Sequence, residues 1–304
     1  MMIRSTIGPY QLVRPLGRGG MAEVYLAIAF GASGFERRVA IKTLAPEHAD
    51  DAALQHALVR EAVLAGALHH RNLVATLGFG LDDGYYLVLE YVDGGDLARL
   101  LGDGEAMPEP LALHVVDELA QGLAYLHAAR DARGLPLAIV HRDVGPANVL
   151  VSTTGDVKLA DFGIAKATAL ADRTAAGTRK GRYSHMAPEQ LAGDPVTQAA
   201  DQFGLGVTLV ELVTGARPFA GEARTIEAPW ALLEAIRTTP PALAGLADDL
   251  RALAARALAL DPAARFASVA ELRAELARAR RGREPAGASD LAAWVAARMG
   301  TVSI

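Results

Sequence analysis

The chain contains no cysteine among its 304 residues. Disulfide bonds, thiolate metal ligands and cysteine nucleophiles are therefore excluded. The sequence also lacks a run of about eighteen uncharged apolar residues, the length that a membrane-spanning helix needs. Its first residues lack the apolar stretch of a signal peptide. We therefore expect a soluble, cytoplasmic protein without a membrane span.

Basic residues are outnumbered by acidic ones, 30 to 35, which gives a formal net charge of −5. This balance argues against a general nucleic-acid binder, because such proteins present a basic surface. Hydrophobic residues make up 51% of the chain and charged residues 21%, a composition that favours a folded core over disorder. The length suits two ordinary domains or one large bilobal domain.

The pattern of the sequence changes near residue 93. Before this point, alternating apolar residues and glycine turns predict five strands, with a helix over about 50–67. After it, the apolar spacing is mainly helical, apart from a hairpin predicted over 148–161. The sequence therefore predicts an α+β architecture, with a small β-rich lobe that carries one helix and a larger helical lobe.

The β-rich part carries two candidate phosphate-binding motifs. LGRGGMAEVYLA, residues 16–27, places Gly17 and Gly19 in a turn between strands, where backbone amides can approach a phosphate closely. Lys42 follows on the strand VAIK, at the position of a lysine that holds nucleotide phosphates. A carboxylate on the next helix can fix this lysine, and Glu61 is a better candidate than Glu47 because apolar neighbours place it near the inner face.

The stretch VHRDVGPANVLV supplies the candidate catalytic groups. Asp143 and Asn148 stand five residues apart, and Asp161 follows thirteen residues later in a DFG sequence. This spacing is that of a catalytic loop followed by a metal-binding aspartate. Asp143 would accept or orient the proton of the substrate hydroxyl, while Asn148 and Asp161 would hold Mg²⁺ through oxygen atoms.

With these motifs in this order, the chain resembles a bacterial protein Ser/Thr kinase of the eukaryotic-like (Hanks) type over about residues 10–276. Ala187–Pro188–Glu189 resembles the end of the activation segment. The resemblance implies that Arg265 pairs with Glu189, and that Asp201 braces the catalytic loop from below.

The resemblance also implies the domain plan and the reaction. A bilobal protein kinase fold would occupy residues 1–280, with an N-lobe over about 10–92 and a C-lobe over about 93–280. Residues 281–304 would form a C-terminal linker and a short helix. The expected reaction transfers the γ-phosphoryl group of ATP to Ser or Thr of protein substrates, with Mg²⁺ or alternatively Mn²⁺ as the metal.

The resemblance also implies which residues line the nucleotide pocket. Val24 and Ala40 would cover the adenine from above and Leu150 from beneath. Glu90 and Val92 would offer backbone hydrogen bonds beside the gatekeeper Leu89, and Asp96 would contact the ribose. The complete set of implied nucleotide-binding residues is Leu16, Gly17, Gly19, Val24, Ala40, Lys42, Glu90, Val92, Asp96 and Leu150.

Two positions depart from the pattern of Ser/Thr kinases. Gly145 stands where the family has a lysine that touches the transferred phosphate, and Arg182 replaces the usual threonine seven residues before Glu189. We hypothesise that Arg182 supplies the missing charge, because phosphoryl transfer depends on electrostatic stabilisation rather than on where in the chain the charge originates. Arg182 facing solvent or binding substrate is the plainer alternative.

Other functions stay open at this stage. Gly145 and Ala22, the latter at the third glycine position of the loop, support a pseudokinase that acts as a nucleotide-binding scaffold. A small-molecule phosphotransferase of related fold is a further alternative, and Arg182 leaves tyrosine specificity open.

The segment between residues 163 and 188 is the predicted site of regulation. Its threonines Thr174 and Thr178 are our preferred phosphorylation sites. A phosphate there adds about −1.5 to −2 charges, and the resemblance implies that Arg142 would bind it. A homodimer for phosphorylation in trans is the partner that this implies besides protein substrates.

Overall fold

The computed structural model describes residues 5–19, 21–102, 104–161, 183–219 and 229–299. The chain divides into two compact units. The described residues of the first unit lie in 5–70 and Val74–Val92, and the second unit takes Arg71–Leu73, Asp93–Asp161 and the described residues from 183 onwards. Each unit contains its own sheet.

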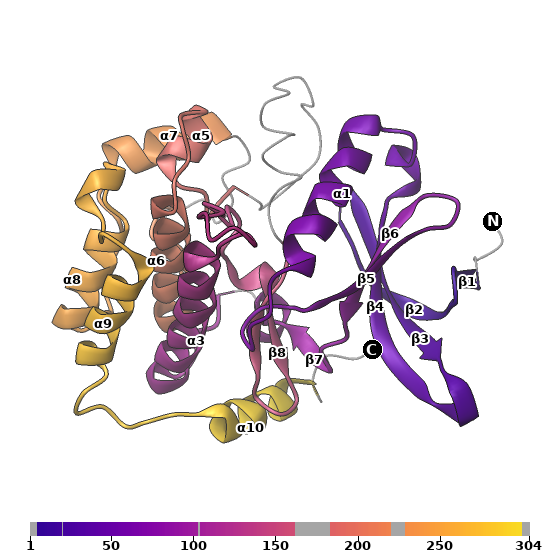
Figure 1. Ribbon diagram of the computed structural model, residues 1–304. Helices are drawn as coiled ribbons and strands as arrows, with labels where there is room; N and C mark the ends of the chain where they lie inside the picture. Colours follow the sequence, from indigo (N-terminus) through magenta and orange to yellow (C-terminus); the bar gives the residue numbers. More distant parts are fainter. Residues whose placement is uncertain (1–4, 20, 103, 162–182, 220–228, 300–304) are drawn as a thin grey trace. The chain divides into compact units, whose positions relative to one another are not determined.

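The described residues of the first unit form a six-stranded antiparallel sheet and one α-helix, which Figure 1 shows. The strands follow the order β1-β2-β3-β4-β6-β5. Their bounds are β1 Thr6–Ile7, β2 Tyr10–Arg18, β3 Ala22–Phe30, β4 Glu36–Leu44, β5 Thr76–Leu81 and β6 Tyr85–Glu90. Helix α1 covers Ala52–Gly66, and short 3-10 helices lie at Ala32–Gly34 and Pro46–His48. The five predicted strands are present, and the two-residue β1 is an addition.

Helix α1 begins at a sequence signal. The Asp51 carboxylate accepts hydrogen bonds from the backbone N–H groups of Ala53 and Leu54, which satisfies donors that a helix start leaves without partners. The helix then packs Leu58 and Ala62 against Leu87 of β6. Because Leu87 is the cross-strand partner of Lys42, α1 covers the sheet face that carries Lys42.

The second unit combines a small sheet with helices. Strands β7 Gly94–Asp96, β8 Val149–Ser152 and β9 Val157–Leu159 form a three-stranded sheet in that order. The helices are α2 Leu97–Leu101, α3 Glu109–Ala128, α5 Pro188–Ala192, α6 Ala199–Thr214, α7 Pro229–Thr238, α8 Asp248–Ala257, α9 Val269–Ala279 and α10 Ala288–Met299, with 3-10 turns at Pro146–Asn148 and Pro262–Ala264. The predicted β8–β9 hairpin is confirmed, and β7 was not predicted.

Helix α6 forms the centre of the second unit. Every residue from 200 to 210 is buried, including Asp201, Gln202 and Thr208. Helices α3 and α8 pack against it. Because polar groups in such a position need hydrogen-bond partners, the polar side chains of α6 determine how neighbouring loops are held.

The last helix, α10, is the short C-terminal helix that the sequence predicts, and it packs back on the second unit. It lies against α2, β7 and β8, and Figure 1 shows it next to the strand labelled β8. Its side chains Leu291, Trp294 and Val295 are buried. Gly155, in the turn between β8 and β9, permits this approach: a Cβ atom there would lie 1.9 Å from the carbonyl oxygen of Ala288. Its φ of +86° also favours glycine.

Across the part of the chain that the structure describes, no helix has both the length and the apolar character needed to cross a membrane.

Candidate active site

The glycine-rich turn joins β2 to β3 in the first unit. Gly17 is opposite Val24 in the register of these strands, and the N–H of Gly19 donates to the carbonyl of Ala22 over 2.8 Å. A Cβ atom at residue 17 would meet no described atom within 4 Å. Packing within the described chain therefore gives no reason for glycine at this position. Leu16, which precedes it, is half-buried.

Lys42 and Glu61 form a buried ion pair in the first unit. Lys42 Nζ lies 2.7 Å from Glu61 Oε1, and the two residues are only 8% and 4% exposed. The pairing predicted from the sequence is therefore confirmed. Glu47, the weaker candidate, instead accepts hydrogen bonds from Arg18 at the surface. Burying two charges carries a desolvation penalty, so the stability of the fold alone does not explain why this ion pair is buried.

The other first-unit residues of the implied pocket surround this pair on the sheet. Val24 is the cross-strand partner of Lys42, and Ala40 precedes Lys42 by two residues, so all three side chains share one face. Leu89 is the partner of Ala40 on β6 and belongs to the same face.

Glu90 and Val92 lie at the end of the first unit. The N–H of Glu90 donates to the carbonyl of Ala75 over 2.9 Å, and its carboxylate accepts from the N–H of Ala75 over 3.0 Å. Glu90 therefore fastens the ends of β5 and β6 together. Val92 is half-buried.

In the second unit the catalytic loop brings Asp143 and Asn148 together. The side-chain amide of Asn148 donates to the backbone carbonyl of Asp143 over 2.8 Å, and its N–H donates to the carbonyl of Gly145 over 2.9 Å. The carbonyl of Asn148 in turn accepts from the N–H of Ala160 over 2.8 Å. These bonds place Asp161, the next residue, beside the same loop.

Arg142 and Asp161 have strained backbones. Their φ angles are +67° and +56°, in the left-handed region that residues other than glycine rarely adopt. Such strain persists only where the surroundings enforce it, and it is concentrated at functional sites. Its occurrence next to Asp143 and at Asp161 marks this loop as a functional candidate.

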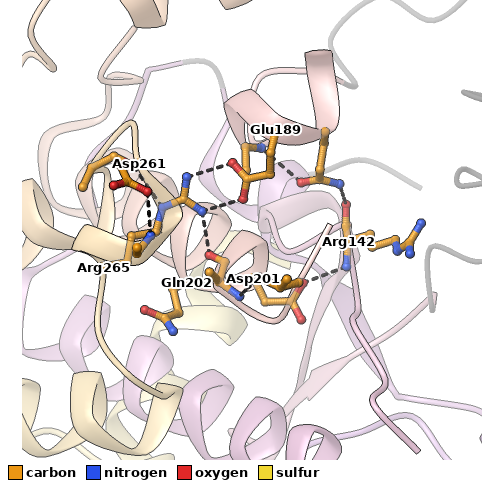
Figure 2. Close-up of polar contacts among 12 residues, drawn as sticks. Arg142, Glu189, Asp201, Gln202, Asp261 and Arg265 are labelled. Atoms are coloured by element: carbon orange, nitrogen blue, oxygen red, sulfur yellow. Dashed lines mark hydrogen bonds and ion pairs between the residues drawn. The ribbon is translucent and has the colours of Figure 1, made fainter. Parts of the chain in front are cut away.

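Asp201 of α6 holds the loop from below, as predicted. Its carboxylate accepts from the N–H groups of His141 over 2.8 Å and Arg142 over 2.7 Å, and from Nε2 of His127 over 2.7 Å. Figure 2 shows the contact with Arg142. Burial lowers the pKa of His141 below its ordinary value, so this ring is neutral and donates from Nε2 to the carbonyl of Ala160.

Arg265 binds Glu189 through two parallel hydrogen bonds, as the resemblance implies. Nη1 and Nη2 of Arg265 lie 2.7 and 2.9 Å from the two carboxylate oxygens (Figure 2). The guanidinium also donates to the carbonyls of Ala199 and Ala259. A guanidinium suits this role, because its planar donors match a carboxylate and further acceptors at once.

Gln190 and Gln202 are buried residues whose backbone-binding side chains the sequence did not indicate. Gln190 accepts from the N–H of Ala187 and donates to the carbonyl of Arg142 over 2.9 Å, which ties the end of the activation segment to the catalytic loop. Gln202 bonds both backbone groups of Phe266 over 3.0 Å. Each amide uses both its donor and its acceptor, and neither position carries a sequence signal that distinguishes it from an exposed glutamine.

Asp96 and Leu150 are cross-strand partners on β7 and β8. The carboxylate of Asp96 accepts from the N–H of Arg99 over 2.8 Å and so caps α2. Burial raises the pKa of Asp96, against the lowering effect of its backbone hydrogen bonds. A contact with ribose stays a prediction.

The predicted residues thus form two sets, one in each unit. Leu16, Gly17, Gly19, Val24, Ala40, Lys42, Glu61, Glu90 and Val92 belong to the first unit, and Asp96, Asp143, Asn148, Leu150 and Asp161 to the second. Arg182, Thr174 and Thr178 lie outside the described residues.

The donor set of the second unit fits a hard divalent cation. Because the amide nitrogen of Asn148 donates to Asp143, the amide oxygen is the atom of this side chain that would act as a metal ligand. Together with the Asp161 carboxylate it offers oxygen ligands, which Mg²⁺ and Mn²⁺ prefer.

Comparisons with known proteins agree with this geometry. Residues 10–275 match the protein kinase domain family. The tyrosine-protein kinase MasK of Myxococcus xanthus is 40% identical over 85% of this chain and 41% of its own length. The serine/threonine-protein kinase PknB of Mycobacterium tuberculosis is 35% identical over 91% of this chain and 44% of its own length.

A solved structure shares the fold. The PknI kinase domain of Mycobacterium tuberculosis superposes with a TM-score of 0.66 at 30% identity and covers 91% of this chain and 99% of the solved one. By contrast, the present chain spans less than half the length of MasK and PknB. The chain belongs to the protein kinase family, among the eukaryotic-like (Hanks-type) kinases of bacteria.

Proposed function

We propose that this protein transfers the γ-phosphoryl group of ATP to serine or threonine hydroxyls of protein substrates. The observation that carries the proposal is the Lys42–Glu61 ion pair, with 2.7 Å between Nζ and Oε1 in a buried setting. Replacing such a pair by apolar residues is often neutral or stabilising. Its presence is therefore explained better by a role in holding phosphates than by folding.

Each acidic or cationic group has a proposed role. Lys42, oriented by Glu61, binds the α- and β-phosphates. Asp143 orients the substrate hydroxyl and accepts its proton as the oxygen attacks phosphorus. The bond between Asn148 and the Asp143 carbonyl holds the two residues in fixed register, which matters because phosphoryl transfer depends largely on positioning.

Asn148 and Asp161 are the proposed ligands of Mg²⁺, with Mn²⁺ as the alternative. When bound, the metal would neutralise charge that develops on the phosphate oxygens. The chain's contribution is to hold Asp161 in its left-handed conformation beside the loop, through the bond between Ala160 and Asn148.

The nucleotide-binding assignments are made separately for the residues of each set. We assign Val24, Ala40 and Leu150 to the faces of the adenine ring, and the backbone of Glu90 and Val92 to its edge. Leu16, Gly17 and Gly19 would cover the phosphates, and Asp96 would contact the ribose. These assignments rest on the match to the protein kinase domain family.

Regulation is proposed to act through phosphorylation of Thr174 and Thr178, with Arg142 as the residue that binds the phosphate. A second copy of the chain would carry out this reaction in trans. Arg182 is the proposed source of the positive charge that Gly145 cannot supply.

Two alternatives have specific support. MasK, the 40% identical relative, is named a tyrosine-protein kinase, which favours tyrosine as the alternative acceptor for this chain. Gly145 supports a pseudokinase that binds ATP without transferring phosphate.

The test is transfer of labelled phosphate from [γ-³²P]ATP to a generic basic protein, followed by phosphoamino-acid analysis. The proposal predicts phosphoserine and phosphothreonine. Phosphotyrosine alone would establish the tyrosine alternative, and nucleotide binding without any transfer would establish the pseudokinase. Mapping at two protein concentrations would show whether Thr174 and Thr178 are modified in trans, because a reaction between two copies accelerates with concentration.

A further inference from the structure

The imidazole ring of His185 occupies the space that a side chain at residue 145 would need. A Cβ atom on Gly145 would lie 2.9 Å from Cγ and 3.2 Å from both Cδ2 and Nδ1 of His185. Gly145 has a φ of 179°, an extended conformation that any residue adopts. Glycine is therefore required here by the ring of His185 and not by the backbone.

His185 is itself held in place by its neighbours. Its Nε2 donates to Glu211 Oε2 over 2.7 Å, and its Nδ1 lies 3.1 Å from Ser184 Oγ. Arg217 donates to the other oxygen of Glu211 over 3.0 Å. Burial raises the pKa of Glu211, but the bonds and charges of His185 and Arg217 outweigh it, and the net pKa lies below its ordinary value. The carboxylate therefore stays ionised and orients the ring.

Because both ring nitrogens of His185 already have partners, the ring is suited to packing rather than to binding a phosphate. Its influence on the site would pass through Gly145. The carbonyl of Gly145 accepts from the N–H of Asn148 over 2.9 Å, and the side chain of Asn148 donates to the carbonyl of Asp143. A displacement of Gly145 therefore moves Asn148 and Asp143 together.

One face of α6 supports the whole arrangement. Asp201 binds the loop before Asp143, and Glu211, ten residues later on the helix, orients His185. Gly204 lies between them, where a Cβ atom would stand 2.8 Å from the carbonyl oxygen of Val144. The helix therefore contacts the catalytic loop directly and, through His185, a second time.

We propose that His185 is a positioning residue for phosphoryl transfer: its ring, fixed by Glu211, packs on Gly145 and thereby holds Asn148 and Asp143 in register. The inference rests on the proposed function. In this chain a side chain at position 145 and the ring of His185 exclude each other, so the ring fills the space that the usual lysine would enter. Restoring lysine at 145 is therefore expected to lower activity while His185 is present.

The test is a double-mutant cycle on the full chain with Gly145→Ala, His185→Ala and the double variant. We expect each single variant to lower kcat about tenfold or more, since misplacement near 1 Å can cost 10²-fold, with little change in the KM for ATP. The double variant should resemble His185→Ala alone, because the added methyl group then has room. Two independent effects would instead multiply.

Two further variants separate positioning from general folding. His185→Phe keeps a ring against Gly145 and should retain much more of kcat than His185→Ala. His56→Ala removes an exposed histidine of α1 and should leave kcat unchanged. Three outcomes would each overturn the inference. The effects of the two single variants could multiply in the cycle, His185→Phe could be as impaired as His185→Ala, or Gly145→Lys could be more active than the natural chain.

Thermal unfolding of the same variants distinguishes this inference from the proposed function. Gly145→Ala should lower Tm in the natural chain and have little effect in the His185→Ala background. A natural chain that transfers no phosphate would overturn the proposed function and the positioning role, while the Tm cycle would still report the contact. An active natural chain whose variants show no coupling would overturn the positioning role alone.

Discussion

Nη1 and Nη2 of Arg265 donate to the two carboxylate oxygens of Glu189 over 2.7 and 2.9 Å, and the Arg265 side chain is fully buried. The two residues are 76 positions apart in the chain, so this pair joins the end of the activation segment to the helices that follow. Removing one partner of a buried pair leaves a charge without compensation, which typically destabilises by about 3–5 kcal/mol.

Arg265→Ala is therefore expected to lower the free energy of unfolding by about 3–5 kcal/mol, as measured by urea denaturation. The matched control is Arg278→Ala on α9, whose partner Glu275 forms an exposed ion pair with it. Exposed pairs contribute about 0–1 kcal/mol. Equal destabilisation by the two variants would contradict the structural role assigned to Arg265.

Lys42→Met is expected to lower kcat/KM for phosphoryl transfer by about 100-fold or more, because removing one preorganised electrostatic contact has an effect of this size. Glu61→Gln should have a smaller effect in the same direction, since it weakens the group that orients Lys42. Glu47→Gln is the control, because Glu47 binds Arg18 at the surface. An effect of Glu47→Gln as large as that of Glu61→Gln would reverse the assignment of the pair.

Helix α10 is expected to stabilise the second unit through its buried face. Leu291 is completely buried, and truncation of such a leucine to alanine typically costs about 2–5 kcal/mol. Met299, on the same helix, is 40% exposed, so Met299→Ala should change stability much less. Chemical denaturation of both variants tests this, and equal small effects would show that α10 contributes little.

His114 on α3 predicts a pH dependence of stability. Burial lowers the pKa of this imidazole; Glu118 and Asp117 oppose the decrease, while Arg280 and Arg71 add to it. As pH falls below about 6.5, the unfolded chain takes up a proton there before the folded chain does, so stability decreases.

Between pH 7.5 and pH 5.5, the Tm of the His114→Gln variant should therefore decrease less than the Tm of the natural chain. The control is His56→Gln, at an exposed position on α1, which should follow the natural chain. Identical Tm profiles for the natural chain and His114→Gln would rule out this contribution.

The sequence predicted those parts of the fold and site that depend on local pattern or on family motifs. Strand alternation and helical spacing located five strands and helix α1 of the first unit and the β8–β9 hairpin of the second, whose remainder was expected only to be mainly helical. Apolar neighbours identified Glu61 as the partner of Lys42. The motifs placed Glu189 opposite Arg265 and Asp201 beneath the catalytic loop. In each case a charged residue is identified either by its spacing from other motif residues or by its apolar neighbours.

The contacts that were missed depend on residues brought together by the tertiary fold. Strand β7 is only three residues long and exists because it pairs with β8. Gln190 bridges Ala187 and Arg142, and nothing local marks that amide as buried. The contact between Gly145 and His185 joins two positions of the chain, and the residues around each position give no indication of the other.

The most direct test of the account is the effect of Asp143→Asn on turnover and on nucleotide binding, measured on the same preparation. The account predicts that the natural chain transfers phosphate from ATP to an acceptor protein, and that Asp143→Asn lowers kcat by at least about 100-fold, within the usual contribution of an acid–base group, with the Kd for ATP unchanged. Equal turnover by the natural chain and the Asp143→Asn variant would contradict this account. A natural chain that binds ATP but transfers no phosphate would contradict it as well.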